Sequence, residues 1–272
     1  MELNPWSLVL VISKLGMYIG FAVAVGGVSL VFVLAGDARR LGQSLSQYLW
    51  IPTGLALLCT GLAFFVQVGA VADSGWSGMW HPLFRSILWS SAVGESTLSR
   101  AIGFALMLFI VATFRTPRDV KGVGWFRILA FVLWVVALHL LADSFSRVGH
   151  TAGLDFWAQL ALSLHVLAIA WWMGALWPLW LSCKQLEGEL LHALMHRFGQ
   201  LAQAAVALLI ALGVFLAIQL LDSVSALWLT EYGRTLSLKL IGVSAILLLA
   251  LYHKLRLVPA LLSNPKNSGR LA

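Results

Sequence analysis

Four residues with polar or ionisable side chains recur at helical spacing near the end of one apolar stretch. His139, Asp143, Ser146 and His150 follow each other at intervals of four, three and four residues. At 100° per residue they fall within about 60° of one another on a helix. If the helix continues to residue 150, they form one polar stripe. The simpler alternative is an exposed helix end, where Asp143 pairs with Arg147 at i,i+4.

A single histidine interrupts the next apolar stretch. His165 is the one ionisable residue between positions 157 and 182. A lone histidine in such a stretch is often a packed core residue. Its sequence position predicts the same depth as the polar stripe, however, and neutral imidazole is a ligand for copper, zinc and haem iron. We therefore count His165 and His139 among the candidate metal ligands, together with His150.

Two further donors lie between the second and third apolar stretches. Met79 and His81 occur in a short segment flanked by Trp76 and Trp80, and Glu95 follows on the same side. Thioether sulfur and imidazole nitrogen both bind soft copper ions, so the segment is a candidate metal-collecting loop. The alternative is a belt of aromatic residues at the membrane surface.

The composition shows what must position these side chains. The chain has 272 residues, of which 60% are hydrophobic and 11% are charged, and its mean hydropathy is +0.90. An average soluble domain has about 45–50% apolar and about 25% charged residues. These figures exclude an ordinary cytosolic enzyme, a disordered chain and a nucleic-acid-binding module. They predict an all-α, polytopic transmembrane bundle that forms one domain over residues 1–272.

Seven stretches are long enough to cross a bilayer core of about 30 Å. They cover residues 6–35, 48–72, 97–114, 125–145, 157–182, 199–221 and 235–258. The short apolar segment 83–94 adds an interfacial helix, a re-entrant helix or an eighth span.

The basic residues predict the orientation. Twelve of the 18 Lys and Arg residues lie in loops 37–46, 115–127 and 183–197 and at the C-terminal end from residue 254 onward, all on one side of the predicted bundle. The positive-inside rule therefore predicts a periplasmic N-terminus and a cytoplasmic C-terminus. With this topology, the ionisable residues within or next to the spans share the outer half of the membrane: Lys14, Arg100, His139, Asp143, His165 and Lys239. Charges are costly there and mark functional positions.

The remaining donors do not form a predicted site. Cys59 and Cys183 have no CxxC neighbour, so neither a disulfide nor a thiolate metal site is expected. His192 and His196 are interpreted as ordinary residues near a helix end on the cytoplasmic side. No Walker motif is present, so ATP-driven pumping by this chain alone is not expected.

Several short motifs, in order, resemble the bacterial copper resistance D family. The resemblance is best over residues 143–260. The matching elements are Gly149-His150-Thr151, Leu164-His165, Trp172, Gly174, Arg197-Phe198, Ala202, Gly213, Tyr232-Gly233, Lys239 and Arg256 to Pro259. Thr151 stands where the family usually has alanine, and family members often have eight spans.

The resemblance implies an inner-membrane protein that moves copper from periplasm to cytoplasm beside a small periplasmic copper-binding protein, the family's C component. In that hypothesis His150 receives copper, with Met79 or His81, while His165 and His139 hold it deeper. Two residues, Asp143 and Glu95, would neutralise the cations of the outer half, Arg100, Lys239 and Lys14.

Two alternatives stay open. His139 and His165 could be the axial ligands of haem b, with Lys239 or Arg100 facing the propionates, in a membrane redox protein such as a cupric reductase. The chain could also be a structural membrane subunit without a metal.

Overall fold

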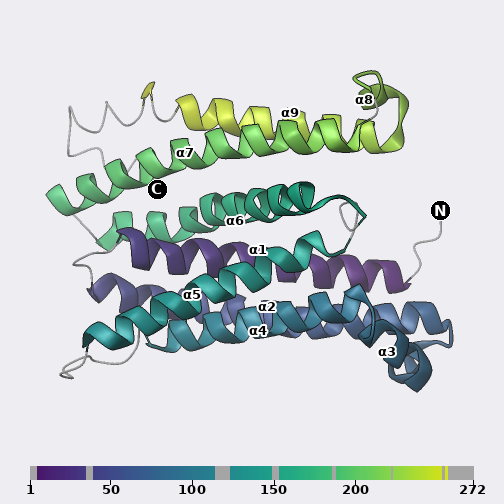
Figure 1. Cartoon of the computed structure of the whole chain (residues 1–272). Helices are drawn as coiled ribbons and strands as arrows, with labels where there is room; N and C mark the ends of the chain where they lie inside the picture. The colour runs from purple at the N-terminus through teal and green to yellow at the C-terminus, as the bar shows by residue number, and fades with distance from the viewer. Residues whose placement is uncertain are drawn as a thin grey trace. The chain divides into compact units, whose positions relative to one another are not determined.

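A computed structural model gives the fold of the chain (Figure 1). It describes residues 5–34, 39–113, 123–148, 153–185, 188–221, 223–252 and 255–256. All regular elements of these ranges are helices: α1 (Pro5–Leu34), α2 (Arg39–Ala72), the short 3₁₀ helix η1 (Trp76–Trp80), α3 (Pro82–Trp89), α4 (Ala92–Thr113), α5 (Val123–Ser146), α6 (Phe156–Gln185), α7 (Gly188–Leu220), α8 (Ala226–Leu229) and α9 (Glu231–Tyr252). The predicted all-α class is confirmed.

Seven of these helices are long and apolar enough to cross a membrane, as predicted. The segment 83–94 is divided between α3 and the start of α4. With eight residues, α3 is only about 12 Å long, so it does not supply an eighth span. The third span is predicted to begin at residue 97, whereas α4 begins at Ala92. The reason is local: the Ser91 hydroxyl accepts a hydrogen bond from the Val93 N–H over 3.2 Å and caps the helix.

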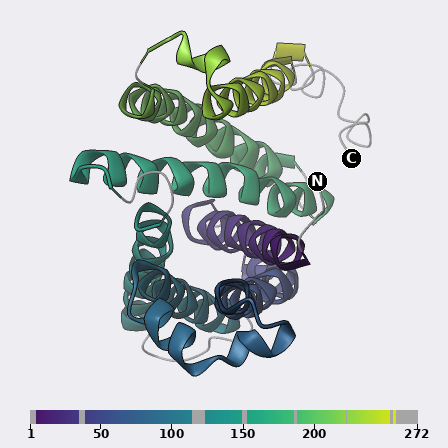
Figure 2. The same ribbon diagram turned by 90° about the vertical axis from the view of Figure 1, so that its right-hand side faces the viewer.

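Five long helices pack in a closed order. Helix α1 contacts α2 and α6, α4 contacts α2 and α5, and α5 contacts α6, so the five axes surround a common core (Figure 2). The core consists of buried apolar side chains, the largest being Phe104, Met17, Leu30, Leu45 and Leu49. Large apolar side chains also cover the outside, as expected where lipid replaces water.

Glycines bring two of these helices into backbone contact. Gly26 of α1 and Gly174 of α6 lie against each other, and a Cβ atom at Gly174 would overlap the Ala22 carbonyl oxygen. Small residues at crossing points permit this close approach in membranes. Gly174, one of the motif residues of the resemblance, therefore has a packing role.

The chain divides into two compact units, residues 1–213 and 214–272, with the boundary inside α7. Within the second unit, Gly233 is buried because the backbone of α8 at Ala226 and Leu227 lies directly against it. The Thr230 hydroxyl accepts a hydrogen bond from the Gly233 N–H over 2.9 Å and caps α9. The predicted single domain stays a prediction.

Candidate functional site

One end of the first unit holds the segment that carries Met79 and His81. The rings of Trp6 and Trp76 are 4.8 Å apart, which joins the start of α1 to η1. The Ser163 hydroxyl lies 3.4 Å from the Ala142 carbonyl oxygen, which joins the first turns of α6 to the last turns of α5. This end therefore holds the start of α1, α4 and α6 and the end of α2 and α5 (Figure 1).

Two of the predicted charge partners meet a cation outside the spans. Arg147 donates from Nε to the Asp143 carboxylate over 2.5 Å and from a terminal nitrogen to Glu95 over 3.1 Å. The hydrogen bond to Asp143 is the main cause that raises the pKa of Arg147 above its ordinary value. The pairing of Asp143 with Arg147, which the sequence offered as the simpler alternative, is therefore formed. Among the described residues, neither Asp143 nor Glu95 pairs with Arg100.

Arg100 instead joins α4 to α5 through uncharged groups. It donates from Nε to the Ser144 hydroxyl and from a terminal nitrogen to the Ser144 carbonyl oxygen, each over 3.0 Å. The guanidinium carbon lies 4.8 Å from the centre of the Phe145 ring, a favourable cation–π distance. Arg100 is therefore a helix-joining residue in this structure.

The polar stripe of α5 is shorter than predicted. The helix ends at Ser146, so it does not carry His150, which lies outside the described residues. The Ser146 hydroxyl donates to the Asp143 carbonyl oxygen over 2.8 Å, a bond typical of a helix end. His139 lies two turns earlier and is exposed on the surface of the unit.

His165 has a different environment. It is half-buried, and its Cε1 lies 3.4 Å from the position that a Cβ atom would take at Gly213 of α7. The backbone of Leu209, one turn earlier on the same face of α7, also lies beside the imidazole. The Nδ1 atom is buried and has no hydrogen-bond partner within the described ranges. Burial of an imidazole nitrogen without a partner is costly unless a ligand completes it.

The two span histidines share a depth but not a direction. The contact between Ser163 and Ala142 gives a common reference level for α5 and α6. At 1.5 Å per residue, His165 lies about 3 Å from this level along α6, and His139 lies about 4.5 Å from it along α5 in the same direction. His165 follows Ser163 by two residues, or about 200°, so it points away from α5. Axial ligation of haem b by His139 and His165 is not supported by this arrangement.

Met79 and His81 pack against neighbouring side chains and backbone. The Met79 Cγ lies 3.0 Å from the Cβ position of Gly69 on α2. The rings of His81 and Phe84 are 4.9 Å apart, and the His81 Nδ1 is buried without a hydrogen-bond partner among the described groups. The rings of Trp76 and Trp80 also pack, in tilted orientations, against Trp6 of α1 and Phe65 of α2. The segment has the features of an aromatic belt, with one imidazole nitrogen left for a ligand.

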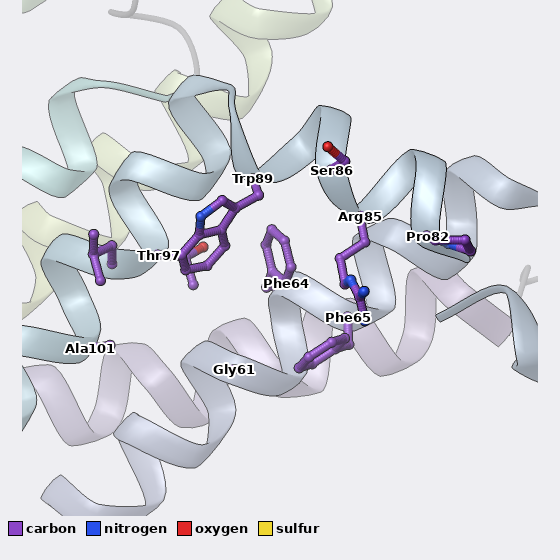
Figure 3. Close-up of a pocket in the computed structure, with 10 residues that line it drawn as sticks. Gly61, Phe64, Phe65, Pro82, Arg85, Ser86, Trp89, Thr97 and Ala101 are labelled. Carbon is purple, nitrogen blue, oxygen red and sulfur yellow. The ribbon is translucent and has the colours of Figure 1, made fainter. Parts of the chain in front are cut away.

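A cavity of about 430 Å³ lies beside this segment (Figure 3). Its walls come from α2, α3 and α4 and are mainly apolar. Figure 3 shows the Arg85 side chain extending from α3 toward Phe65, while Trp89 and Phe64 line the opposite part. No histidine, cysteine, methionine or carboxylate lines the cavity. It therefore provides no copper ligands.

The last two predicted cations belong to different units. Lys14 is half-buried on α1, and Lys239 is exposed on α9 in the second unit. Among the residues with described positions, no three His, Cys, Asp or Glu side chains come together as a metal site. Sequence reasoning missed Ser144 as the partner of Arg100, since a serine beside an aspartate carries no distinctive signal.

Comparison with known proteins identifies part of the chain. Residues 192–272 match the family model described as copper resistance protein D. No match is found among curated proteins or solved structures. The matched stretch contains most of α7 and all of α9, including the Gly213 that faces His165. The chain is thus a multi-pass inner-membrane protein that is similar, over residues 192–272, to the copper resistance protein D family.

Proposed function

We propose that this protein carries copper across the inner membrane, from periplasm toward cytoplasm, and that His165 binds the ion within the membrane. One observation carries the proposal. The only histidine between positions 157 and 182 directs its imidazole at α7, the helix on which the copper resistance match begins. Its Nδ1 is buried without a partner in the described part of the chain.

The chemistry of this position suits a transported copper ion. Imidazole binds both oxidation states of copper without carrying a charge of its own. Gly213 has no side chain, and the Cε1 of the ring lies 3.4 Å from the position that a Cβ atom would take there. A single strong donor holds an ion without enclosing it, which permits the ion to enter and to leave, as transport requires.

Three of the other predicted donors take their place upstream of His165 in this proposal, where His150, and Met79 or His81, receive copper at the periplasmic end. His139 is exposed on the surface of the unit at the depth of His165 and takes no part in the proposed path. The orientation follows the distribution of basic loops, with the N-terminus in the periplasm. The resemblance adds a periplasmic copper-binding C component as donor.

Copper accumulation in cells tests the proposal. His165→Ala and His150→Ala are compared with His139→Ala as the matched control at the same depth. We expect accumulation to fall about tenfold or more in the first two, because even outer-shell changes at metal sites cost about 10–100-fold. Accumulation at the wild-type level in both His165→Ala and His150→Ala would refute the proposal, provided that immunoblots show equal amounts of protein.

A further inference from the structure

Two sulfur atoms meet at the other end of the helix pair that holds His165. The Sγ of Cys183, near the end of α6, lies 4.0 Å from the Sδ of Met195 in the second turn of α7. Cys183 follows His165 by eighteen residues in the same helix, which places it about 27 Å further along. This distance is close to the thickness of a bilayer core, about 30 Å.

The sulfur pair has a spacing that a single metal ion can bridge. Metal–thiolate bonds are about 2.3 Å long, and two such bonds that meet at 120° hold their sulfurs about 4.0 Å apart. Thiolate and thioether are the soft ligands that select Cu(I) among common metals. The existing sulfur–sulfur distance is therefore compatible with two of the three bonds of a trigonal site.

A third donor lies one turn away. His192 precedes Met195 by three residues, which places the two side chains about 60° apart on α7. Around the helix axis, the same spacing places His192 between Met195 and His196. The ring of His192 stacks on that of His196, with centres 6.3 Å apart. The nearby cation is already engaged, since the Lys184 Nζ lies 3.6 Å over the Trp180 ring.

We propose that Cys183 and Met195 form a Cu(I) site, with the His192 imidazole as third ligand. When Cu(I) binds, the thiol of Cys183 releases its proton to solvent and a copper–thiolate bond forms, with no change in oxidation state. The inference deepens the proposed function, on which it rests for the identity of the metal: this site receives copper that has passed His165. Sequence inspection missed it, because the partner of the cysteine is a thioether twelve residues later on another helix.

The chain provides a matched control. Cys59 is the other free cysteine, and its Sγ lies against Gly16 at the crossing of α1 and α2. Met173 is an exposed methionine on α6. Cys59→Ser and Met173→Leu therefore remove the same chemical groups at positions without the sulfur pair.

The test is an anaerobic titration of the full-length purified protein with Cu(I) against a chromophoric Cu(I) chelator. We expect Cys183→Ser to bind one Cu(I) fewer than the wild type. Met195→Leu keeps the side-chain volume and is expected to weaken binding of that ion about tenfold or more, with a smaller loss in His192→Ala. Cys59→Ser and Met173→Leu are expected to bind as the wild type does.

Equal Cu(I) stoichiometry in the wild type and Cys183→Ser would overturn this inference, as would unchanged affinity in Met195→Leu. Thermal unfolding of each variant shows whether it is folded. The proposed function fails separately, when His165→Ala and His150→Ala cells accumulate copper normally while Cys183 still binds Cu(I). Absence of Cu(I) binding at Cys183, together with impaired accumulation in His165→Ala cells, would instead refute the inference alone.

Discussion

Arg100 on α4 donates two hydrogen bonds to Ser144 on α5, one to its hydroxyl and one to its carbonyl oxygen, each over 3.0 Å. A charged side chain within a span costs about 2.5–3.5 kcal/mol on insertion scales. Here this cost is offset by a bidentate contact and by the Phe145 ring beneath the guanidinium. The cation therefore has a structural explanation that requires no anionic ligand or metal.

Arg100→Lys tests this role. Lysine keeps the charge but lacks the planar fork that bonds two acceptors at once. We expect the free energy of unfolding to fall by about 1.5–3 kcal/mol, as for hydrogen bonds to charged groups, measured by thermal unfolding in detergent. Ser144→Ala keeps the carbonyl acceptor and is expected to lose less. Equal stability of Arg100→Lys and wild type would contradict the assignment.

The ion pairs of Arg147 are expected to contribute little to the free energy of unfolding. Its side chain and that of Glu95 are 44% and 61% exposed, and exposed pairs stabilise by less than about 1 kcal/mol. Arg147→Gln should therefore lower stability slightly at low salt and not at all at high salt. Arg85→Gln is the control, because Arg85 forms no ion pair with the described residues.

The pH dependence of the ion pair between Arg147 and Asp143 follows from the direction in which pairing shifts the pKa of Arg147. Pairing raises the pKa of Arg147, so its contribution is fully present below the ordinary pKa of arginine and is lost only as pH rises through the raised value. We expect the difference in melting temperature between wild type and Arg147→Gln to stay constant from neutral to moderately alkaline pH. A difference that disappears in this range would contradict the pairing.

The spans were predictable because each one depends on the composition of a single continuous segment. The partners of the side chains were not predictable, because they depend on which helices are neighbours and on how each helix is rotated about its own axis. The spacing of Asp143 and Arg147 revealed one ion pair, but the pairing with Glu95 requires the packing of α4 on α5. Likewise, the facing of His165 toward Gly213 requires the placement of α7 beside α6.

Gly174→Val is expected to disrupt the first unit. A side chain there would overlap the Ala22 carbonyl oxygen and force α1 away from α6. Overpacking of this kind costs about 3 kcal/mol, which should reduce the yield of monodisperse protein in size-exclusion chromatography. Gly54→Val is the control, because no atom lies within 4 Å of its Cβ position. Equal yields of the two variants would refute the close crossing.

The predicted orientation is testable with single cysteines. In a background that lacks Cys59 and Cys183, Ser77→Cys and Lys184→Cys place thiols at exposed positions at opposite ends of the first unit. We expect a membrane-impermeant maleimide added to spheroplasts to label residue 77 and not residue 184. Inside-out vesicles should give the opposite result. Labelling of residue 184 from outside would reverse the topology and the proposed direction of transport.

Gly213→Leu tests whether the ion passes between His165 and the helix α7 that faces it. A Cβ atom at Gly213 would already lie 3.4 Å from the imidazole Cε1, so a leucine side chain must displace or cover the ring. We expect copper accumulation to fall about as far as in His165→Ala, while Gly199→Leu on open surface of the same helix stays near wild type. Because both changes block the same step, the double variant should accumulate no less copper than His165→Ala alone. A further fall in the double variant would mean that Gly213 and His165 act independently, and that the ion does not pass between them.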